Sequence, residues 1–412
     1  MHPSYARRLV LLAALYVSQA VPLGFFIVAV PAVLRSRGLS LESVGLLGAL
    51  ALPWLLKFLW APLVDRYGAA RGHYRSWILP LQTACVVSVL AIAFVDLDGG
   101  MPWLFVAGAA FMLFSATQDI AADGLAVSVL QPSERGVANG VQVGGYYLGQ
   151  IAGGGVVLLL YSSFGWTPAV LFMALLLGLA MIPVWSYPEP ERPAGAPSER
   201  TDFAALKRFF ARPGAGLWAL VLVLFRAGEA MALTMFNPLL VDRGLALDQI
   251  GLALGVVGSL GSLAGALLGG LLLQRLGRRV SLVVFGVFQS LALLGYLAPA
   301  RGFVEMVWVM PVVAVAACAG GLATAALYTC MMDRCDPRTP ATDFTLQQSL
   351  AAIGPMIGAT TSGVLAAAIG YELLFVLSSA IVVAAVALVV LRLTPSVAAP
   401  SQEVQSAEGV GA

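Results

Sequence analysis

Long apolar runs separated by short polar segments alternate along the chain. A helix of about 20 residues crosses the hydrocarbon core of a bilayer. Runs of that length recur near residues 9–34, 43–64, 77–96, 101–130, 137–161, 167–187, 216–240, 249–273, 280–299, 305–332, 341–368 and 372–394. We therefore predict twelve membrane-spanning helices. The first run is longer than the apolar region of a cleaved signal peptide, so we expect it to be a retained span.

Composition supports a polytopic membrane protein. Hydrophobic residues make up 60% of the chain and charged residues 11%, against about 25% charged in soluble domains. The net charge of +2 gives no basic face for nucleic acid. Two histidines and four scattered cysteines offer no metal or redox motif. We expect no cofactor, no metal site and no nucleic-acid partner.

The basic residues predict the orientation. Of 23 lysines and arginines, Lys57 and Arg226 lie within predicted spans, and four others (Arg35, Arg37, Arg243 and Arg301) lie on the side opposite the termini. The other seventeen lie on the side of both termini. The excess of positive charge marks the cytoplasmic side. We expect both termini in the cytoplasm.

One long polar segment divides the predicted spans into six and six. Residues 188–215 begin as a Pro-rich linker and include "TDFAALKRFF", whose acidic start and basic end are typical of a short interfacial helix. We expect helical bundles over residues 1–187 and 216–394, and a disordered cytoplasmic tail over residues 395–412.

The two halves share short sequences in the same order. "RGLSLESVGLL" at residues 37–47 matches "RGLALDQIGLA" at residues 243–253. "PLVDRYG" after the second span matches "LLLQRLG" after the eighth, and "SERGVANGVQ" before the fifth loosely matches "DPRTPATDFTLQ" before the eleventh. Three ordered matches indicate an internal repeat.

The twelve spans and the repeated loop resemble the major facilitator superfamily, whose cytoplasmic loop motif is G-x-L-x-D-R-x-G-R-[RK]. The second copy fits from Gly270 to Arg279 except that Gln274 replaces the aspartate, while the first has Ala61 for the first glycine. The resemblance implies an all-α fold of two six-helix bundles and a monomer. It also implies a gating role for Asp65, Arg66, Gly68, Gln274, Arg275, Gly277 and Arg278. Asp65 is expected near the end of the eleventh span and its dipole.

A finer resemblance rests on "KFLWAPLVDRYG" and "ATQDIAADG". Both are similar to a branch containing muropeptide permeases, acetyl-coenzyme A transporters and bacterial importers of ferric siderophores such as pyochelin and rhizobactin. The opening sequence and the compact length are most similar to the siderophore group. This implies an inner-membrane secondary transporter that imports a ferric siderophore, with a muropeptide permease as the alternative.

Motifs of other function classes are missing from the sequence. It contains no G-x-x-x-x-G-K-[ST] phosphate loop, so ATP is not expected to drive transport directly. It has no clustered histidines and no G-x-S-x-G elbow, which argues against an enzyme. A non-transporting membrane sensor is a further alternative, against which stands the lack of a folded soluble domain.

Charged residues inside predicted spans are candidates for function, because a charge at the bilayer centre costs about 3 kcal/mol. At 1.5 Å per residue, Lys57 lies about 12 Å and Asp123 about 10 Å from the cytoplasmic helix ends, with Asp119 one turn further in. We expect Lys57 to pair with Asp123 or Asp119. The alternative is that its stem reaches to the cytoplasmic headgroups.

The seventh span carries Arg226 and Glu229, three residues apart on one helical face. This pair either stabilises the helix or lines a cavity. The predicted spans thus contain two cations, Lys57 and Arg226, and three carboxylates. The carboxylate in excess is a candidate proton carrier.

Spans one, four, seven and ten line the cavity in the family that the chain resembles. Gln19, Gln118 and Asp119 are therefore candidates for substrate contact. Phe25, Trp54 and Tyr146 are candidates for stacking on an aromatic ligand, with packing as the alternative.

Glycines at four-residue spacing predict close helix packing. They lie in span five (Gly145, Gly149, Gly153), span eight (Gly251, Gly255, Gly261, Gly265, Gly269) and span eleven (Gly354, Gly358). We expect them to form smooth seams on which the two halves rock during alternating access. The alternative is the general glycine richness of a chain with 44 glycines.

Overall fold

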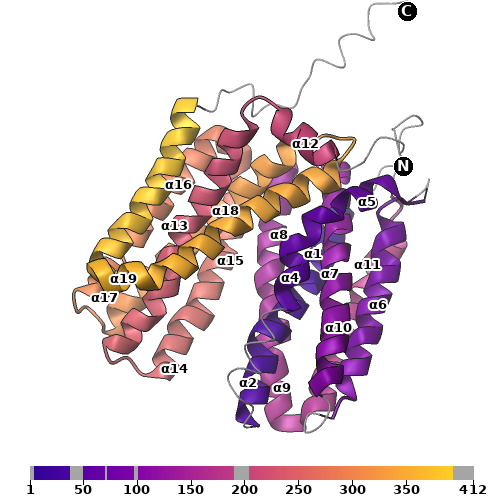
Figure 1. Ribbon diagram of the computed structural model, residues 1–412, viewed down its shortest axis with the longest axis horizontal. Coiled ribbons are helices and arrows are strands. Elements are labelled where there is room, and N and C mark those ends of the chain that lie inside the picture. The colour runs from indigo at the N-terminus through magenta and orange to yellow at the C-terminus, as the bar shows by residue number, and fades with distance from the viewer. Residues whose placement is uncertain (1–3, 38–49, 70–71, 97–100, 190–203, 393–412) are drawn as a thin grey trace, which may run out of the picture. The chain divides into compact units, whose positions relative to one another are not determined.

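The computed structural model describes residues 4–37, 50–69, 72–96, 101–189 and 204–392 (Figure 1). Within these ranges the chain is helical and has no strand. Ten of these helices are long and apolar enough to cross a membrane. The predicted tail (395–412), the Pro-rich part of the linker and most of the first repeat sequence (37–47) lie outside the described residues.

The described helices belong to two compact units. Unit 1 comprises residues 1–130, 141–207 and 336–349, and unit 2 comprises residues 131–140, 208–335 and 350–412. The units differ from the predicted division at residue 187 in two segments. The start of the fifth span belongs to unit 2, and the start of the eleventh span belongs to unit 1.

The helices follow the predicted runs closely. Unit 1 contains α1 (Tyr5–Gly24), η1 (Phe25–Ala29), α2 (Val30–Ser36), α4 (Leu52–Leu56), η3 (Lys57–Leu59), α5 (Ala61–Arg66), α6 (Arg75–Ala93), α7 (Met101–Val129), η4 (Ile151–Val156), α9 (Val157–Phe164), α10 (Trp166–Leu179) and α11 (Met181–Ser186). Unit 2 contains α13 (Ala215–Asp242), α14 (Leu247–Ile250), η5 (Gly251–Val257), α15 (Gly258–Leu276), α16 (Arg278–Leu294), α17 (Leu297–Ala300) and α18 (Met306–Asp333). The helices α8 (Arg135–Gln150), α12 (Ala204–Ala211) and α19 (Pro340–Arg392) have residues in both units.

The second predicted span is not one continuous helix. Among its described residues, α4 leads into the 3₁₀ turn η3 at Lys57, and α5 begins after Trp60. Pro62 has no amide hydrogen, so it cannot bond to the carbonyl four residues earlier. Broken helices at membrane depth are tolerated where other groups satisfy the freed backbone, and they are common at binding sites.

The last long helix, α19, contains two predicted spans. Its 53 residues include Gly370, whose φ of 80° lies in the left-handed region that favours glycine. This residue separates the predicted spans at 341–368 and 372–394. The ten long helices therefore account for eleven of the twelve predicted spans, and the broken second span accounts for the rest.

Aromatic and branched side chains fill the helix contacts inside each unit. In unit 1, Phe25 is fully buried and its ring lies 5.0 Å from that of Phe26 and 5.7 Å from that of Trp166. In unit 2, Phe236 stacks on Tyr296 with ring centroids 4.0 Å apart. Phe25 is thus placed as a packing residue, which is the alternative that the sequence left open.

The predicted glycine seams pack mainly against helices of their own unit. A Cβ atom at Gly153 would strike the backbone of Val21 in α1, and one at Gly265 would strike that of Cys318 in α18. A Cβ atom at Gly358 would lie 2.5 Å from the carbonyl oxygen of Ala227 in α13. These glycines allow close packing within a unit. Their predicted role in the rocking of the two halves stays a prediction.

A different pair of glycines brings the first residues of α8 close to α15 inside unit 2. In unit 2, a Cβ atom at Gly136 would lie 2.8 Å from the carbonyl oxygen of Gly270, and one at Gly140 would lie 2.8 Å from that of Ala266. The spacing of four residues between Gly136 and Gly140 is the same signal that the sequence analysis used for other glycines. It was missed because Gly136 lies before the predicted start of the span at residue 137.

Candidate functional site

Lys57 is buried inside unit 1 and forms an ion pair with Asp119. The lysine is 4% exposed, and its ammonium group contacts the Asp119 carboxylate of α7. It also donates a hydrogen bond of 2.5 Å to the side-chain oxygen of Gln348 at the start of α19, and it lies 5.1 Å from the ring centroid of Trp54. The expected ion pair between the second and fourth spans is therefore present, in place of the alternative in which the lysine extends to the headgroups.

Asp123 is the second candidate carboxylate, and Lys57 forms its ion pair with Asp119 instead. It is fully buried, one turn from Asp119 on α7. Its Oδ1 atom accepts hydrogen bonds from the Tyr16 hydroxyl at 3.1 Å and from the Gln142 amide at 3.3 Å. The structure thus separates the two aspartates, because one has a cationic partner and the other has neutral donors.

Two glutamines of the predicted site have unused donors. Gln19 and Gln118 are 3% and 2% exposed, and their Nε2 atoms have no hydrogen-bond partner among the described residues. The Tyr16–Asp123 bond fixes α1 against α7. The first and fourth spans run in opposite directions, so later residues of α1 lie level with earlier residues of α7. Gln19 lies one turn beyond Tyr16, which puts it at the level of Gln118 and Asp119. Buried unpaired donors are rare in proteins and call for an explanation such as a ligand.

The second predicted pair, in α13, is more open. Arg226 donates hydrogen bonds to Glu229 at 2.5 Å and to Thr324 of α18 at 3.1 Å. The two charged side chains are 27% and 16% exposed. Tyr146, the last aromatic candidate, is 41% exposed and packs edge-on against Tyr147.

Asp65 of the first loop motif binds the start of α19. Its carboxylate accepts hydrogen bonds from the Thr342 amide at 2.7 Å, the Thr342 hydroxyl at 2.6 Å and the Ala341 amide at 3.3 Å. The Tyr74 hydroxyl donates a fourth at 2.7 Å. An acid at a helix N-terminus satisfies amides that have no partner in the helix and interacts favourably with the helix dipole. The family resemblance implied this position, whereas Thr342 and Tyr74 were not predicted.

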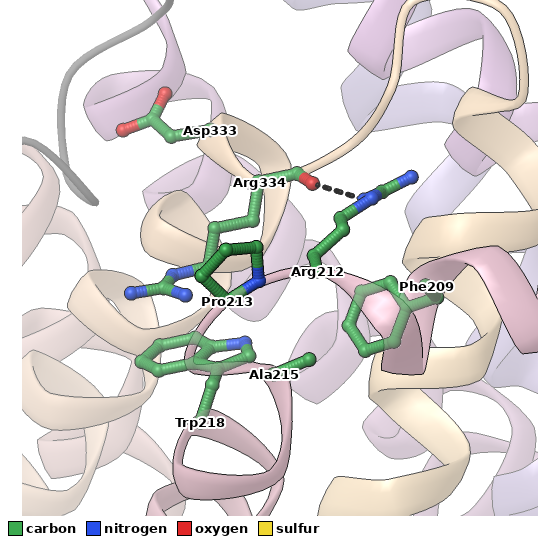
Figure 2. A pocket seen from close by; sticks show the side chains of 7 residues that line it. All are labelled: Phe209, Arg212, Pro213, Ala215, Trp218, Asp333 and Arg334. Carbon is green, nitrogen blue, oxygen red and sulfur yellow. Dashed lines mark hydrogen bonds between the residues drawn. The ribbon is translucent and has the colours of Figure 1, made fainter.

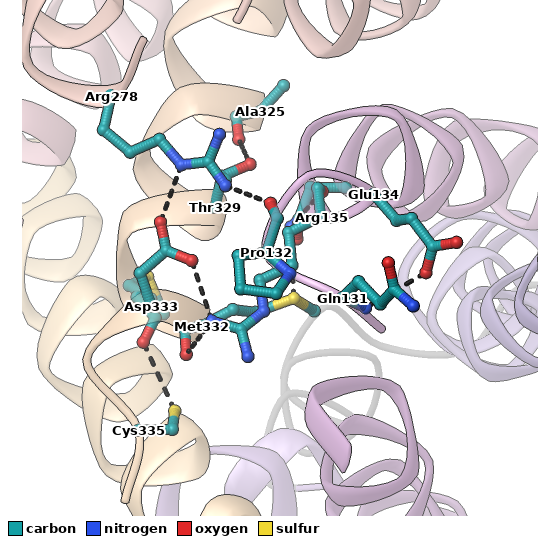
Figure 3. Close-up of polar contacts among 12 residues, drawn as sticks. Gln131, Pro132, Glu134, Arg135, Arg278, Ala325, Thr329, Met332, Asp333 and Cys335 are labelled. Atoms are coloured by element: carbon teal, nitrogen blue, oxygen red, sulfur yellow. Dashed lines mark hydrogen bonds and ion pairs between the residues drawn. The ribbon is translucent and has the colours of Figure 1, made fainter. Parts of the chain in front are cut away.

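The second loop motif has its acid elsewhere. Among the described residues, the Gln274 side chain donates a 3.2 Å hydrogen bond to the Ser133 carbonyl. The carboxylate is that of Asp333 at the end of α18, which binds Arg278 at 2.7 Å and Arg135 at 2.8 Å (Figure 3). Arg278 also donates to the Pro132 carbonyl.

Asp333 and Arg135 were missed because both lie outside the loop motif. The loose repeat between "SERGVANGVQ" and "DPRTPATDFTLQ" marks the segments that start α8 and α19, and it was the signal available. The remaining motif residues are peripheral: Arg66 and Arg275 are exposed, and the Arg66 guanidinium lies 5.2 Å from the Tyr67 ring.

Comparisons with known proteins agree with this architecture. The family model described as Major Facilitator Superfamily matches residues 12–349. The anhydromuropeptide permease of Escherichia coli (strain K12) is 30% identical over 350 residues, covering 84% of this chain and 71% of that protein. An uncharacterised protein of Haemophilus influenzae is 29% identical over 383 residues, covering 89% and 90% of the two chains.

Solved structures show the same fold. The human organic anion transporter MFSD10 superposes with a TM-score of 0.71, at 14% identity, over 94% of this chain and 100% of that one. At this identity the likeness concerns the fold alone. The family match and the permease relative point to transport rather than catalysis. The chain therefore belongs to the major facilitator superfamily and is a multi-pass membrane transporter.

Proposed function

We propose that this transporter is a bacterial inner-membrane permease for anhydromuropeptides or closely related cell-wall fragments. The observation that carries the proposal is the 30% identity to an anhydromuropeptide permease across 84% of the chain. The reported relative with an assigned substrate is thus a muropeptide permease, so this substrate class replaces the ferric siderophore as our main hypothesis. Import into the cytoplasm, with both termini on that side, is part of the proposal.

The polar groups of unit 1 suit such a substrate. Muropeptides carry carboxylates on the peptide stem and amides and hydroxyls on the sugars. A substrate carboxylate can compete with Asp119 for the Lys57 ammonium, and the unused amide donors of Gln19 and Gln118 can bind its carbonyl or hydroxyl oxygens. A site built from such donors rejects analogues that lack the matching acceptors.

We further propose that transport is coupled to protons through Asp123. This carboxylate lies one turn from Asp119 and has neutral hydrogen-bond donors rather than a cation. When the substrate takes Lys57, Asp119 loses its counter-charge beside Asp123, and two adjacent carboxylates favour uptake of one proton. The substrate thereby promotes proton binding at the same site, which is the differential interaction that symport requires.

Uptake by proteoliposomes tests the proposal. With the outside acidic, we expect the wild-type protein to accumulate radiolabelled anhydromuropeptide, and Asp123→Asn to lose the dependence on the proton gradient. Asp242→Asn, which alters an exposed acid that accepts a hydrogen bond from Tyr371, is the matched control and should transport normally. Accumulation of ferric pyochelin without any muropeptide uptake would contradict the proposal, and failure to transport either would favour a sensor.

A further inference from the structure

A cationic cavity lies in unit 2 beside the junction between the linker and α13. Its volume is about 160 Å³, and it is lined by Phe209, Arg212, Pro213, Ala215, Trp218, Asp333 and Arg334 (Figure 2). A cavity needs roughly 10–15 Å³, measured in the same way, to hold one water molecule. The cavity therefore has room for a group the size of a phosphate. None of its residues belongs to the proposed transport site.

Arg334 provides a cation that the described protein does not neutralise directly. Its guanidinium lies over the ring of Trp218 (Figure 2), and the distance to the ring centroid is 4.1 Å. Burial lowers the pKa of Arg334, and the neighbouring Asp333 carboxylate offsets only part of that effect. Both oxygens of Asp333 are already bound, one to Arg135 and one to Arg278.

Arg212 provides a second cation in a fixed position. Its guanidinium donates a 3.0 Å hydrogen bond to the Arg334 carbonyl oxygen, and it lies 5.2 Å from the ring centroid of Phe209. Phe209 is 2% exposed, so the ring under this arginine is packed against its neighbours. Among the described residues that line the cavity, Asp333 is the one carboxylate, and its two oxygens bind Arg135 and Arg278.

The position of the cavity is that of a membrane interface. It adjoins the first turn of α13 and the last residues of α18, both membrane-spanning helices. The neighbouring helix α12 exposes 49% of Phe210 next to the exposed Arg208. Tryptophan at a span end and a short helix with apolar and basic faces are typical of the headgroup region.

We propose that Arg334 and Arg212 bind the phosphate of an anionic phospholipid in this cavity. Guanidinium groups bind phosphate through paired N–H donors, and here the aromatic rings of Trp218 and Phe209 hold the two groups in place. The acyl chains of such a lipid would lie along the outer surface of α13. The bound lipid would hold the linker helix α12 against unit 2.

Lipid titration of the purified protein tests the inference. We expect phosphatidylglycerol to raise the melting temperature more than phosphatidylcholine with the same acyl chains, and native mass spectrometry to retain it. Arg334→Gln should weaken the apparent affinity for phosphatidylglycerol about ten-fold, the usual cost of one charged hydrogen bond. Arg334→Lys, which keeps the charge without the flat stacking group, should lose less.

Two controls make the result decisive. Arg208→Gln removes an exposed cation from the same helix and should leave phosphatidylglycerol binding unchanged. Arg212→Gln gives a second test should Arg334→Gln fail to fold. Equal losses in Arg208→Gln and Arg334→Gln would show a general charge effect and overturn the site. Stabilisation by inorganic phosphate alone, without a preference for phosphatidylglycerol, would overturn the assignment to a lipid.

Discussion

The two loop motifs hold their helices with acids from different positions. In unit 1, Asp65 of the motif itself accepts hydrogen bonds from the first turn of α19. In unit 2, the corresponding position is Gln274, and the carboxylate that binds Arg135 and Arg278 is Asp333 at the end of α18. Each loop motif therefore has a charged anchor, but the acid comes from the motif itself in unit 1 and from the end of α18 in unit 2.

This difference changes the physics of the two anchors. Asp65 is fully buried and accepts hydrogen bonds from neutral amide and hydroxyl donors, so dissolved salt has little access to these contacts. Asp333 binds two guanidinium groups that are 13% and 17% exposed, and salt screens such partly exposed pairs. The deeper pairs differ in the same sense, because Lys57 is 4% exposed and Arg226 is 27% exposed.

The glycines of the motifs also serve different ends. A Cβ atom at Gly68 would strike the imidazole ring of His73, so this glycine is required for space. Gly277 has open space around it but a φ of 77°, so it is required for its backbone conformation. Glycine at the same position of the two motifs is thus required for two different physical reasons.

The largest effect is expected from the deepest pair. Lys57→Ala should abolish uptake and lower the free energy of unfolding by roughly 3–5 kcal/mol, because it leaves the Asp119 charge buried without a partner. The matched change Arg226→Ala should cost less, about 1–2 kcal/mol, since its partner is closer to solvent.

A double variant separates stability from transport. Lys57→Met combined with Asp119→Leu removes both charges and should recover most of the melting temperature without recovering uptake. Normal uptake by Lys57→Ala, or uptake restored by the double variant, would remove Lys57 from the transport mechanism.

The next effect is expected at the anchor of unit 1. Asp65→Asn keeps the shape but weakens charge-assisted hydrogen bonds to the start of α19, worth roughly 1.5–3 kcal/mol in total. We expect slower transport in reconstituted vesicles with surface expression near normal. Thr342→Val removes a single hydroxyl donor and should have a smaller effect in the same assay. An unchanged transport rate in Asp65→Asn would argue against gating at this contact.

The sequence predicted the features that depend on position along the chain, namely the long helices and the depth of the buried charges. The length and spacing of apolar runs predicted the long helices. Counting residues from the helix ends placed Lys57 near the level of Asp119 and Asp123, but it did not decide which of the two is its partner. Depth follows from a constant rise per residue, so it requires no knowledge of packing. The family resemblance supplied the place of Asp65, which counting alone does not give.

The features that were missed depend on how helices turn toward one another. Gln348 lies 291 residues from Lys57 in sequence, and nothing local indicates that they meet. The break at η3 was missed because "LPWLLKFLWAPLVDRYG" is apolar enough for one span, although Pro62 signalled a weak point. Asp333 was missed because the motif search looked for an acid at position 274.

The third effect concerns salt at the anchor of unit 2. Asp333→Asn leaves Arg135 and Arg278 without their carboxylate and should lower the free energy of unfolding by about 1–2 kcal/mol at low salt. The loss should shrink at about 1 M salt, where the screening length is about 3 Å. The loss caused by Asp65→Asn should change little over the same range. Thermal melts at the two salt concentrations compare the anchors directly, and an equal salt response would contradict the contrast drawn here.

The smallest effect is expected on restoring the motif. Gln274→Asp removes a 3.2 Å donor to the Ser133 carbonyl at an exposed position, so in the wild-type background it should change stability by less than about 0.5 kcal/mol. In the Asp333→Asn background, the new carboxylate gives Arg278 an anion again and should return part of the lost stability. A double-mutant cycle measured by thermal melts gives this coupling. Strict additivity would mean that an acid at 274 cannot replace the one at 333, and that the two loops anchor their helices by unrelated contacts.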